Sequence, residues 1–294
     1  MAVISAQERV GERRQGIGWA LLRNTKFVVG TVIFLALVIS ALVGSLTVEV
    51  AERRSGTFPL RVPPGQEFLL GTTSLGQSVA IQLTEAIPNS VLVGLLAATI
   101  GTVVGALIGF VSGYFGGWID SILRILIDVF LSVPSLLFLI LIAALVRGVG
   151  VTAMALIIGA FAWPSPARQV RAQVLSLKER GFVQVARLSG MNGLEIIVIE
   201  LMPHMVQWLG ANFVNAFIAA VLAESGLSIL GLGPQREMTL GMMVYWALNY
   251  SAVFQNLWWW WATPVLTLMA LFLSLYLVHI GLDEASNPRL QAEG

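Results

Sequence analysis

Hydrophobic residues along the chain gather into long runs that are separated by polar segments. Six such runs lie near residues 27–46, 89–113, 121–145, 150–168, 206–230 and 257–280. An apolar helix needs about 20 residues to cross the hydrocarbon core of a bilayer, and these runs reach or approach that length. The pattern predicts an all-α polytopic membrane protein with six transmembrane helices. It leaves an N-terminal arm at 1–26, a polar insert at 47–88, a loop at 171–205 and a tail at 281–294.

The loop at 171–205 contains an amphipathic stretch, FVQVARLSGMNGLEIIVIELMP, at residues 182–203. Its apolar side chains recur with the i, i+3, i+4, i+7 spacing of one helix face, at Leu194, Ile197, Val198 and Leu201. We predict two short helices with a bend between Gly190 and Gly193. We expect Pro203 to end the second helix, because proline cannot donate a backbone hydrogen bond. A helix of this kind docks either on the membrane or on a partner protein, and we favour a partner.

Small residues, prolines and tryptophans mark particular positions within the runs. Small side chains fall on every fourth position of the second run, at Ala97, Gly101, Gly105, Gly109 and Gly113. This stripe predicts close helix packing, with a gliding surface during transport as the alternative. We expect helix breaks or kinks at Pro134 and Pro164. The run Trp258 to Trp261 predicts an anchor at the outer membrane interface.

Composition narrows the possible chemistry. Of the 294 residues, 57% are hydrophobic and only 11% are charged, whereas a soluble domain has about 25% charged residues. Cysteine is absent, and the two histidines lie far apart in the sequence, so we expect no metal site. The net charge of +1 gives no reason to expect a nucleic-acid partner. Neither lysine follows a glycine, so the chain has no Gly-Lys-Ser/Thr phosphate loop, and any driving ATP must be bound by another chain.

The basic residues predict how the chain is oriented. Most of the 17 lysines and arginines lie in the N-terminal arm and around the 171–205 loop. Cytoplasmic loops are enriched in lysine and arginine, so the loop is predicted to be cytoplasmic and the insert at 47–88 external. An even number of spans places both termini in the cytoplasm.

Two acids fall inside predicted spans, Asp128 in the third and Glu224 in the fifth. Charge at membrane depth costs several kcal/mol, so it usually faces a cavity or a partner. They are candidates for lining a polar pathway or for pairing with another subunit. The alternatives are hydrogen bonding to nearby backbone, or a position closer to the interface than the predicted boundaries.

Several blocks of the chain resemble one family, the permeases of binding-protein-dependent ABC importers. The cytoplasmic loop of these permeases has the pattern Glu-Ala-Ala, three residues, then glycine, and it ends in an Ile-x-Leu-Pro-like segment. Gln184, Val185 and Ala186 take the first three places here, and Gly190 the glycine. GYFGGWID at 113–120, DVFLSVPSL at 128–136 and ESGLSILGLG at 224–233 are similar to the dipeptide and oligopeptide branch, specifically its second permease.

The resemblance implies a type I importer permease in the cell membrane, without enzymatic activity or a cofactor of its own. It would pair with a second, homologous permease, sit on two cytoplasmic ATPases that bind ATP and Mg²⁺, and receive cargo from an external solute-binding protein. The segment at 182–203 would be the coupling helix. The residues implied to contact the ATPase are Gln184, Val185, Ala186, Arg187, Gly190 and Met191.

The chain departs from the family pattern at two places. Gln184 replaces an acid in the loop, and Thr73, Gln77 and Ser78 replace three charges before the second span. These departures bear on the external contacts and on the cargo. Peptides are the first expectation, with oligosaccharides or nickel complexes on the same architecture as alternatives. A more distant alternative is an autonomous secondary transporter, although no internal repeat is evident.

Overall fold

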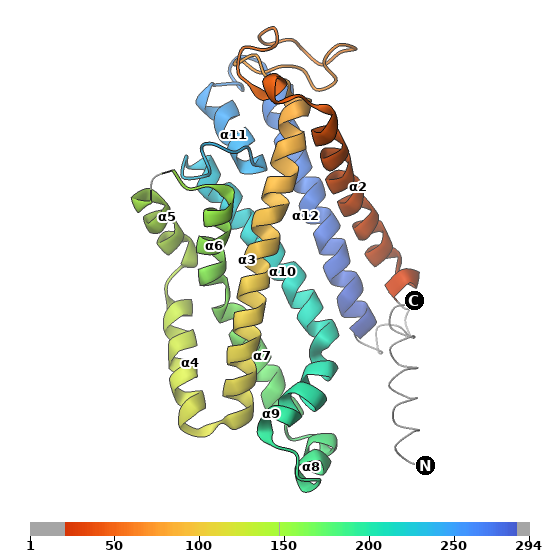
Figure 1. The fold of residues 1–294 in the computed structure, drawn as a ribbon, viewed down its shortest axis with the longest axis vertical. Helices are drawn as coiled ribbons and strands as arrows, with labels where there is room; N and C mark the ends of the chain where they lie inside the picture. Colours follow the sequence, from red (N-terminus) through yellow and green to blue (C-terminus); the bar gives the residue numbers. More distant parts are fainter. Residues whose placement is uncertain (1–20, 147, 287–294) are drawn as a thin grey trace.

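The computed structural model describes residues 21–146 and 148–286, which form an elongated helical bundle (Figure 1). The elements in chain order are α2 (Thr25–Thr47), η1 (Val50–Arg53), α3 (Val79–Phe115), α4 (Gly117–Ser132), α5 (Ser135–Leu145), α6 (Val151–Ala162), α7 (Pro164–Leu177), α8 (Gly181–Leu188), α9 (Gly193–Glu195), η2 (Ile196–Leu201, a π-helix), α10 (Met202–Ile229), α11 (Leu240–Asn249) and α12 (Trp258–Ser286). Among these residues the only β pairing is an isolated bridge between Thr72 and Ser78. The all-α prediction is confirmed.

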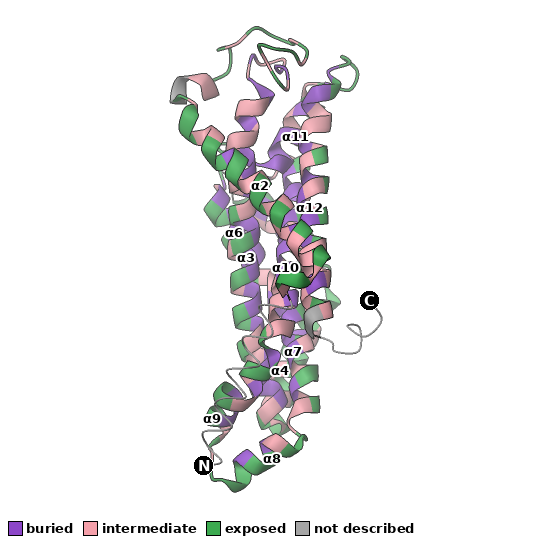
Figure 2. Cartoon of the chain, turned by 90° about the vertical axis from the view of Figure 1, so that its right-hand side faces the viewer, coloured by how far each residue is buried: buried purple, intermediate pink, exposed green. Residues whose placement is uncertain are grey.

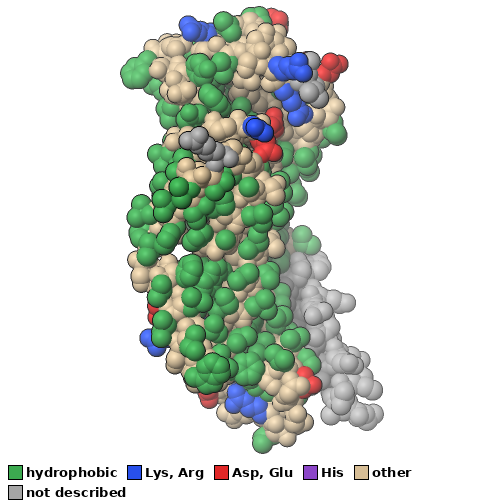
Figure 3. Space-filling view, turned by 60° about the vertical axis from the view of Figure 1, so that its left-hand side comes forward, with side chains coloured by type: hydrophobic (Ala, Val, Ile, Leu, Met, Phe, Trp, Pro, Cys, Tyr) green, Lys and Arg blue, Asp and Glu red, His purple; other side chains and the backbone are tan. Residues whose placement is uncertain are grey.

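Several helices are long and apolar enough to cross a membrane. Four described helical stretches meet this criterion: Thr25–Thr47, Val79–Phe115, Gly193–Ile229 and Trp258–Glu284. The pair α4 and α5 meets it together, with a bend of 73° between the two helices. On the face shown in Figure 3, charged side chains gather toward the two ends and the middle is largely hydrophobic. This distribution is the one that a bilayer requires of a spanning protein.

Proline breaks two of the predicted spans. Pro134 separates α4 from α5, so the kink expected there is present as a sharp bend. The fourth predicted span, 150–168, is not one helix, because α6 ends at Ala162 and α7 starts at Pro164. Pro164 lies in the first turn of α7, where a missing N–H costs nothing. The break expected at Pro164 is therefore present, and the helix that follows it extends to Leu177, into the predicted loop.

Helix α3 packs against four other helices of the bundle: α2, α6, α7 and α10. Its glycine stripe is the reason that α7 can approach so closely. A Cβ added at Gly105 would lie 2.6 Å from the Trp163 carbonyl oxygen, and one at Gly109 would lie 2.6 Å from the Val170 Cβ. Both distances are shorter than real Cβ contacts, so only glycine fits. The stripe is a packing surface inside this chain.

The second predicted span began too late. It was expected at residue 89, but α3 begins at Val79. The first helical turns of α3, before residue 89, contain polar residues, and the sequence pattern therefore assigned them to the insert. Their side chains are satisfied inside the helix bundle: Glu85 accepts a hydrogen bond from the Met238 backbone, and Asn89 donates one to the Met238 carbonyl. The helix also continues through Pro88.

The segment between η1 and α3, which is most of the predicted insert, folds into a compact loop at the end of the bundle opposite α8 (Figure 1). Thr73 is fully buried, and its hydroxyl accepts hydrogen bonds from the backbone N–H groups of Leu75 and Gln77. The Gln77 side chain donates to the Arg53 carbonyl and accepts from Gln82. The departures from the family pattern at Thr73 and Gln77 thus lie in the internal framework of the insert. They carry little information about cargo.

The tryptophan run is only partly an interface anchor. Trp258 is 56% exposed, but Trp259 and Trp260 are buried in the core. The Trp259 indole donates to the Thr72 carbonyl at 3.1 Å, which ties the external insert to α12. The prediction of an interface anchor was therefore wrong for these two residues, because Trp259 is hydrogen-bonded to the insert and Trp260 packs against Tyr250.

Helix α2 lies at the edge of the bundle. It packs mainly on α12, where Gly30 contacts the α12 backbone and Gly281 contacts Phe27, and its remaining surface is largely exposed (Figure 2). Asn24 caps α2 and also donates to Glu284 near the end of α12. The predicted arm at 1–26 and tail at 281–294 lie mostly outside the described residues.

Candidate functional site

The helix at the lower end of the bundle is α8, and it ends in a glycine turn. The Met191 N–H donates to the Ala186 carbonyl at 3.2 Å, and the Gly190 N–H donates to the Arg187 carbonyl at 3.1 Å. This is the Schellman pattern that closes a helix, with Gly190 in the left-handed conformation at φ +85°. A Cβ at Gly190 would meet no atom within 4 Å. The residue therefore terminates the helix, and it leaves open space beside the turn.

The two faces of α8 have different environments. Val183 and Ala186 are buried against a cluster that includes Phe110, Val170 and Leu201. The opposite face is exposed, and we call it the coupling face; it consists of Gln184, Val185, Arg187 and Leu188. Val185 is 62% exposed and Leu188 is 89% exposed, which is unusual for aliphatic side chains on a helix with a well-packed inner face.

The structure sorts the predicted contact residues into three groups. Gln184, Val185 and Arg187 lie on the coupling face, and Gly190 is exposed at its end. Met191 is half-buried against the core cluster. The Ala186 side chain is only 6% exposed and packs inside this chain, so it adds almost no surface to the coupling face. Sequence reasoning also missed Leu188, although an aliphatic residue directly before the Ser-Gly turn was a usable signal.

The segment that follows the turn is anchored firmly to the base of α3. Asn192 and Glu195 form a capping box, with distances of 3.0 and 2.8 Å between side chains and backbone N–H groups. A Cβ at Gly193 would lie 2.9 Å from the Tyr114 ring, so glycine is needed for this contact. The Arg187 guanidinium lies over the same ring, 5.4 Å from its centroid. Lys178, just before α8, donates to the Gly113 carbonyl at the end of α3. Movement of α8 would therefore be transmitted to α3.

The predicted end of the amphipathic stretch was wrong. Helix continues from Gly193 through η2 and α10 to Ile229. Pro203 does not terminate it, because residues 196–201 form a π-helix and the Met202 N–H donates to the Ile197 carbonyl. The wider turn changes the hydrogen-bond register just before the proline, where a missing donor is then tolerated. As a result, Gly193–Ile229 is one continuous helical rod, which the turn at Gly190 separates from α8.

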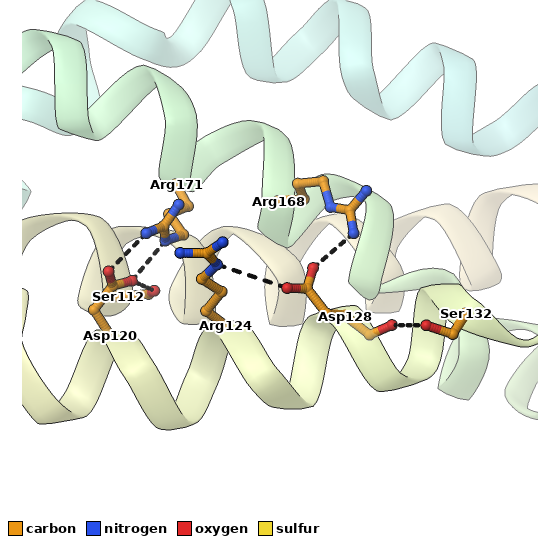
Figure 4. A network of polar contacts seen from close by, with 7 residues as sticks. All are labelled: Ser112, Asp120, Arg124, Asp128, Ser132, Arg168 and Arg171. Carbon is orange, nitrogen blue, oxygen red and sulfur yellow. Dashed lines mark hydrogen bonds and ion pairs between the residues drawn. The ribbon is translucent and has the colours of Figure 1, made fainter.

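Asp128 is not buried in this chain, and its place in a pathway or in a permease pair stays a prediction. Its side chain is 47% exposed and forms ion pairs with Arg168 at 2.7 Å and Arg124 at 3.6 Å (Figure 4). Asp120 lies about two helical turns before Asp128 on α4. It accepts two hydrogen bonds from Arg171, both at 2.6 Å, and one from Ser112. The hydrogen bonds to Asp120 raise the pKa of Arg171, so this guanidinium stays charged. These pairs link α4 to α7.

Glu224 is fully buried, as predicted for an intramembrane acid. Its carboxyl oxygen accepts hydrogen bonds from Ser228 at 2.6 Å and from Thr239 at 2.7 Å. The Thr239 hydroxyl in turn caps α11 by accepting from the Met242 N–H. Glu224 therefore joins α10 to α11. It does not line the cavity described next.

A cavity of about 400 Å³ lies where the two proline breaks face α10. Residues from α4, α5, α6, α7 and α10 line it, and none of the lining residues is charged. Its polar groups are Ser135, Ser165, Gln169, Asn212 and Asn215. Three alanines on α10, Ala216, Ala219 and Ala223, form much of one wall. The cavity adjoins both proline breaks, since Pro134 and Pro164 are among the residues that line it.

Comparison with known proteins decides the family. The sequence model of the "Binding-protein-dependent transport system inner membrane component" family matches residues 101–292. The chain belongs to this family. Among curated relatives, the oligopeptide transport system permease protein OppC of Mycobacterium tuberculosis is 31% identical over 228 residues, covering 77% of each chain. The dipeptide transport system permease protein DppC of Bacillus subtilis is 30% identical over 276 residues, covering 93% of this chain and 85% of DppC.

A solved structure agrees at the level of the fold. The chain is similar to an inward-facing structure of the MetNI methionine ABC transporter, with a TM-score of 0.55 and 18% identity. The match covers 72% of this chain and 96% of the other. Together these findings make the chain a multi-pass permease subunit of an ABC importer. The recognition made from the loop and span motifs is confirmed.

Proposed function

We propose that this chain is one of two permease halves that together carry peptides into the cell, powered by partner ATPases. The observation that supports this most directly is the coupling face of α8. It presents Val185 and Leu188 outward at one end of the bundle, while Gly193 and Lys178 hold the same segment to α3. An apolar face held out by a rigid support is what a docking partner needs.

The partners follow from this arrangement. Two cytoplasmic ATPases would bind ATP and Mg²⁺, and the coupling face would seat in a groove of one of them. A second permease would complete the pathway, and an external solute-binding protein would deliver cargo to the opposite end. Both termini would lie on the ATPase side. ATP-driven closure would move α8, and α3 would move with it through the contacts of Lys178 and Gly193, while the turn at Gly190 would pass the movement on to α10.

Peptides are the proposed cargo because the relatives OppC and DppC are named for oligopeptide and dipeptide transport. The unusual Thr73 and Gln77 positions no longer argue against this cargo, since both residues are engaged within the external insert.

The absence of cysteine allows a direct test of ATPase docking. A single cysteine placed by Leu188→Cys is expected to form cross-links to an ATPase subunit in the purified complex. Val253→Cys provides the matched control, because Val253 is 52% exposed and belongs to the segment between α11 and α12, which lies at the end of the bundle opposite α8 (Figure 1). Cross-linking of the control but not of Leu188→Cys would overturn the assigned docking surface.

Transport itself is tested in proteoliposomes that contain the complete complex and its binding protein. Uptake of a labelled tripeptide should require ATP on the side of the membrane where the ATPases lie. Uptake of a malto-oligosaccharide or a nickel complex instead of the peptide would replace the proposed cargo. Solute movement by this chain alone, without ATP, would favour a secondary transporter.

A further inference from the structure

The cavity between α10 and the two proline breaks holds a set of neutral amides. Asn212 and Asn215 lie one turn apart on α10, and Gln169 lies on α7. The two walls therefore present amide groups to the same space. Ser135 and Ser165 add hydroxyl groups, and Phe130 and Phe161 contribute aromatic surface.

The amides keep hydrogen-bonding capacity for a ligand. Asn212 uses its NH₂ group on the Trp208 carbonyl at 3.2 Å, and Gln169 donates to Ser165 at 3.1 Å. Within residues 21–146 and 148–286, the Asn215 side chain has no hydrogen-bond partner, and it is exposed to the cavity. An amide carries both donors and an acceptor, which matches the N–H and C=O groups of a peptide main chain.

The charges near the cavity are placed outside it. The ion pairs of Asp128 with Arg168 and of Asp120 with Arg171 lie between α4 and α7, and neither pair belongs to the cavity lining. Glu224 is turned toward α11. A passing charged side chain would therefore meet no fixed charge here, either attractive or repulsive.

We propose that Gln169, Asn212 and Asn215 are cargo-contacting residues that bind the main chain of a peptide and do not discriminate by side-chain charge. This inference rests on the proposed function and adds the residues and the recognition chemistry. The volume of about 400 Å³ accommodates a short stretch of peptide, and the second permease would close the open side. Selection among peptides by charge is then left to the external binding protein.

The test places a charge where the structure has none. Three labelled tripeptides, Ala-Glu-Ala, Ala-Lys-Ala and Ala-Gln-Ala, are supplied on saturated binding protein to the complete complex in proteoliposomes. The measured quantity is uptake per ATP hydrolysed. For Asn215→Asp, we expect the ratio of Lys to Glu peptide uptake to rise about tenfold over the wild-type ratio, because a carboxylate in a cavity of low dielectric constant repels a like charge strongly. Asn249→Asp makes the same change at an exposed position at the end of α11, and should leave the ratio unchanged.

Each outcome has a distinct meaning. If wild-type complex moves none of the three peptides, peptide transport fails as the proposed function, and the inference fails with it. If wild-type uptake is normal and Asn215→Asp leaves the ratio unchanged, the inference alone is overturned. Should Asn215→Asp not assemble, Gln169→Glu tests the opposite wall, and an unchanged ratio there overturns the inference equally. Asn215→Leu should lower uptake of all three peptides alike, since it removes the amide without adding charge.

Discussion

Helices α3 and α10 both carry small side chains at helical spacing along one face. On α3, Gly105 and its neighbours are filled by α7, to the point that no Cβ would fit. On α10, Ala216, Ala219 and Ala223 face the cavity of about 400 Å³. Small residues thus allow α7 to pack closely on α3, whereas on α10 they leave the cavity unfilled. The difference comes from what lies opposite each face, because α7 packs along the α3 stripe whereas the α10 alanines face the cavity beside the breaks at Pro134 and Pro164.

The contact between α3 and α7 should tolerate no added atoms. Gly105→Ala is expected to destabilise the protein by about 2 kcal/mol, since its Cβ would press on the Trp163 backbone carbonyl, which cannot move aside cheaply. Thermal unfolding of the purified protein measures this. Gly226→Ala is the matched control, because nothing lies within 4 Å of its Cβ and alanine favours helix. Equal stability of the two variants would contradict the packing role of the stripe.

The cavity face of α10 should respond in the opposite way. Ala219→Leu is expected to fold with little loss of stability and to lower peptide uptake about tenfold, which corresponds to about 1.4 kcal/mol. The added side chain would occupy the cavity, where space is available. Uptake and thermal unfolding are measured on the same preparation. Val206→Leu enlarges a side chain on the same helix that is 59% exposed and does not line the cavity, and should change neither quantity.

Gly190 represents a third use of glycine, since it supplies a backbone conformation and makes no close contact. Gly190→Asp should leave the protein inserted and folded, because aspartate tolerates the left-handed region and its Cβ meets no atom. We expect uptake to fall several-fold while ATP hydrolysis continues, because a charge would stand beside the coupling face. Gly190→Asn separates charge from bulk and should retain more uptake. Unchanged uptake by the aspartate variant would remove Gly190 from the docking surface.

Helix α4 is held to α7 by ion pairs as well as by packing, and the exposed pair should be the weaker support. Asp128→Asn is expected to lower the free energy of unfolding by less than about 1 kcal/mol, since both ion pairs of Asp128 are half-exposed and screened by solvent. Denaturant unfolding at low and high salt measures the effect. A loss of several kcal/mol would mean that the α4–α7 contact depends on this residue.

Much of the fold was predictable because bilayers constrain sequences strongly. The apolar runs, the break at Pro134 and the small-residue stripe each follow from local composition and spacing. The bend expected near Gly190 is present, and the Schellman turn explains why glycine stands there. Predictions were wrong where a segment distant in the sequence hydrogen-bonds or covers the residues concerned. The polar start of α3 is completed by the backbone around Met238, and the external insert covers Trp259.

The sequence by itself determined the class of this protein: a helical membrane permease of the importer type, with a basic loop that carries the coupling helix. Only the tertiary structure decided which side of each element is free. It buried Ala186 and exposed Leu188 on the same short helix, and it placed Asp128 at a surface and Glu224 in the core. It also distinguished a filled stripe on α3 from an open one on α10. The physical reason is that spacing along a helix defines its faces, whereas the occupant of each face depends on where the proline breaks direct the neighbouring helices.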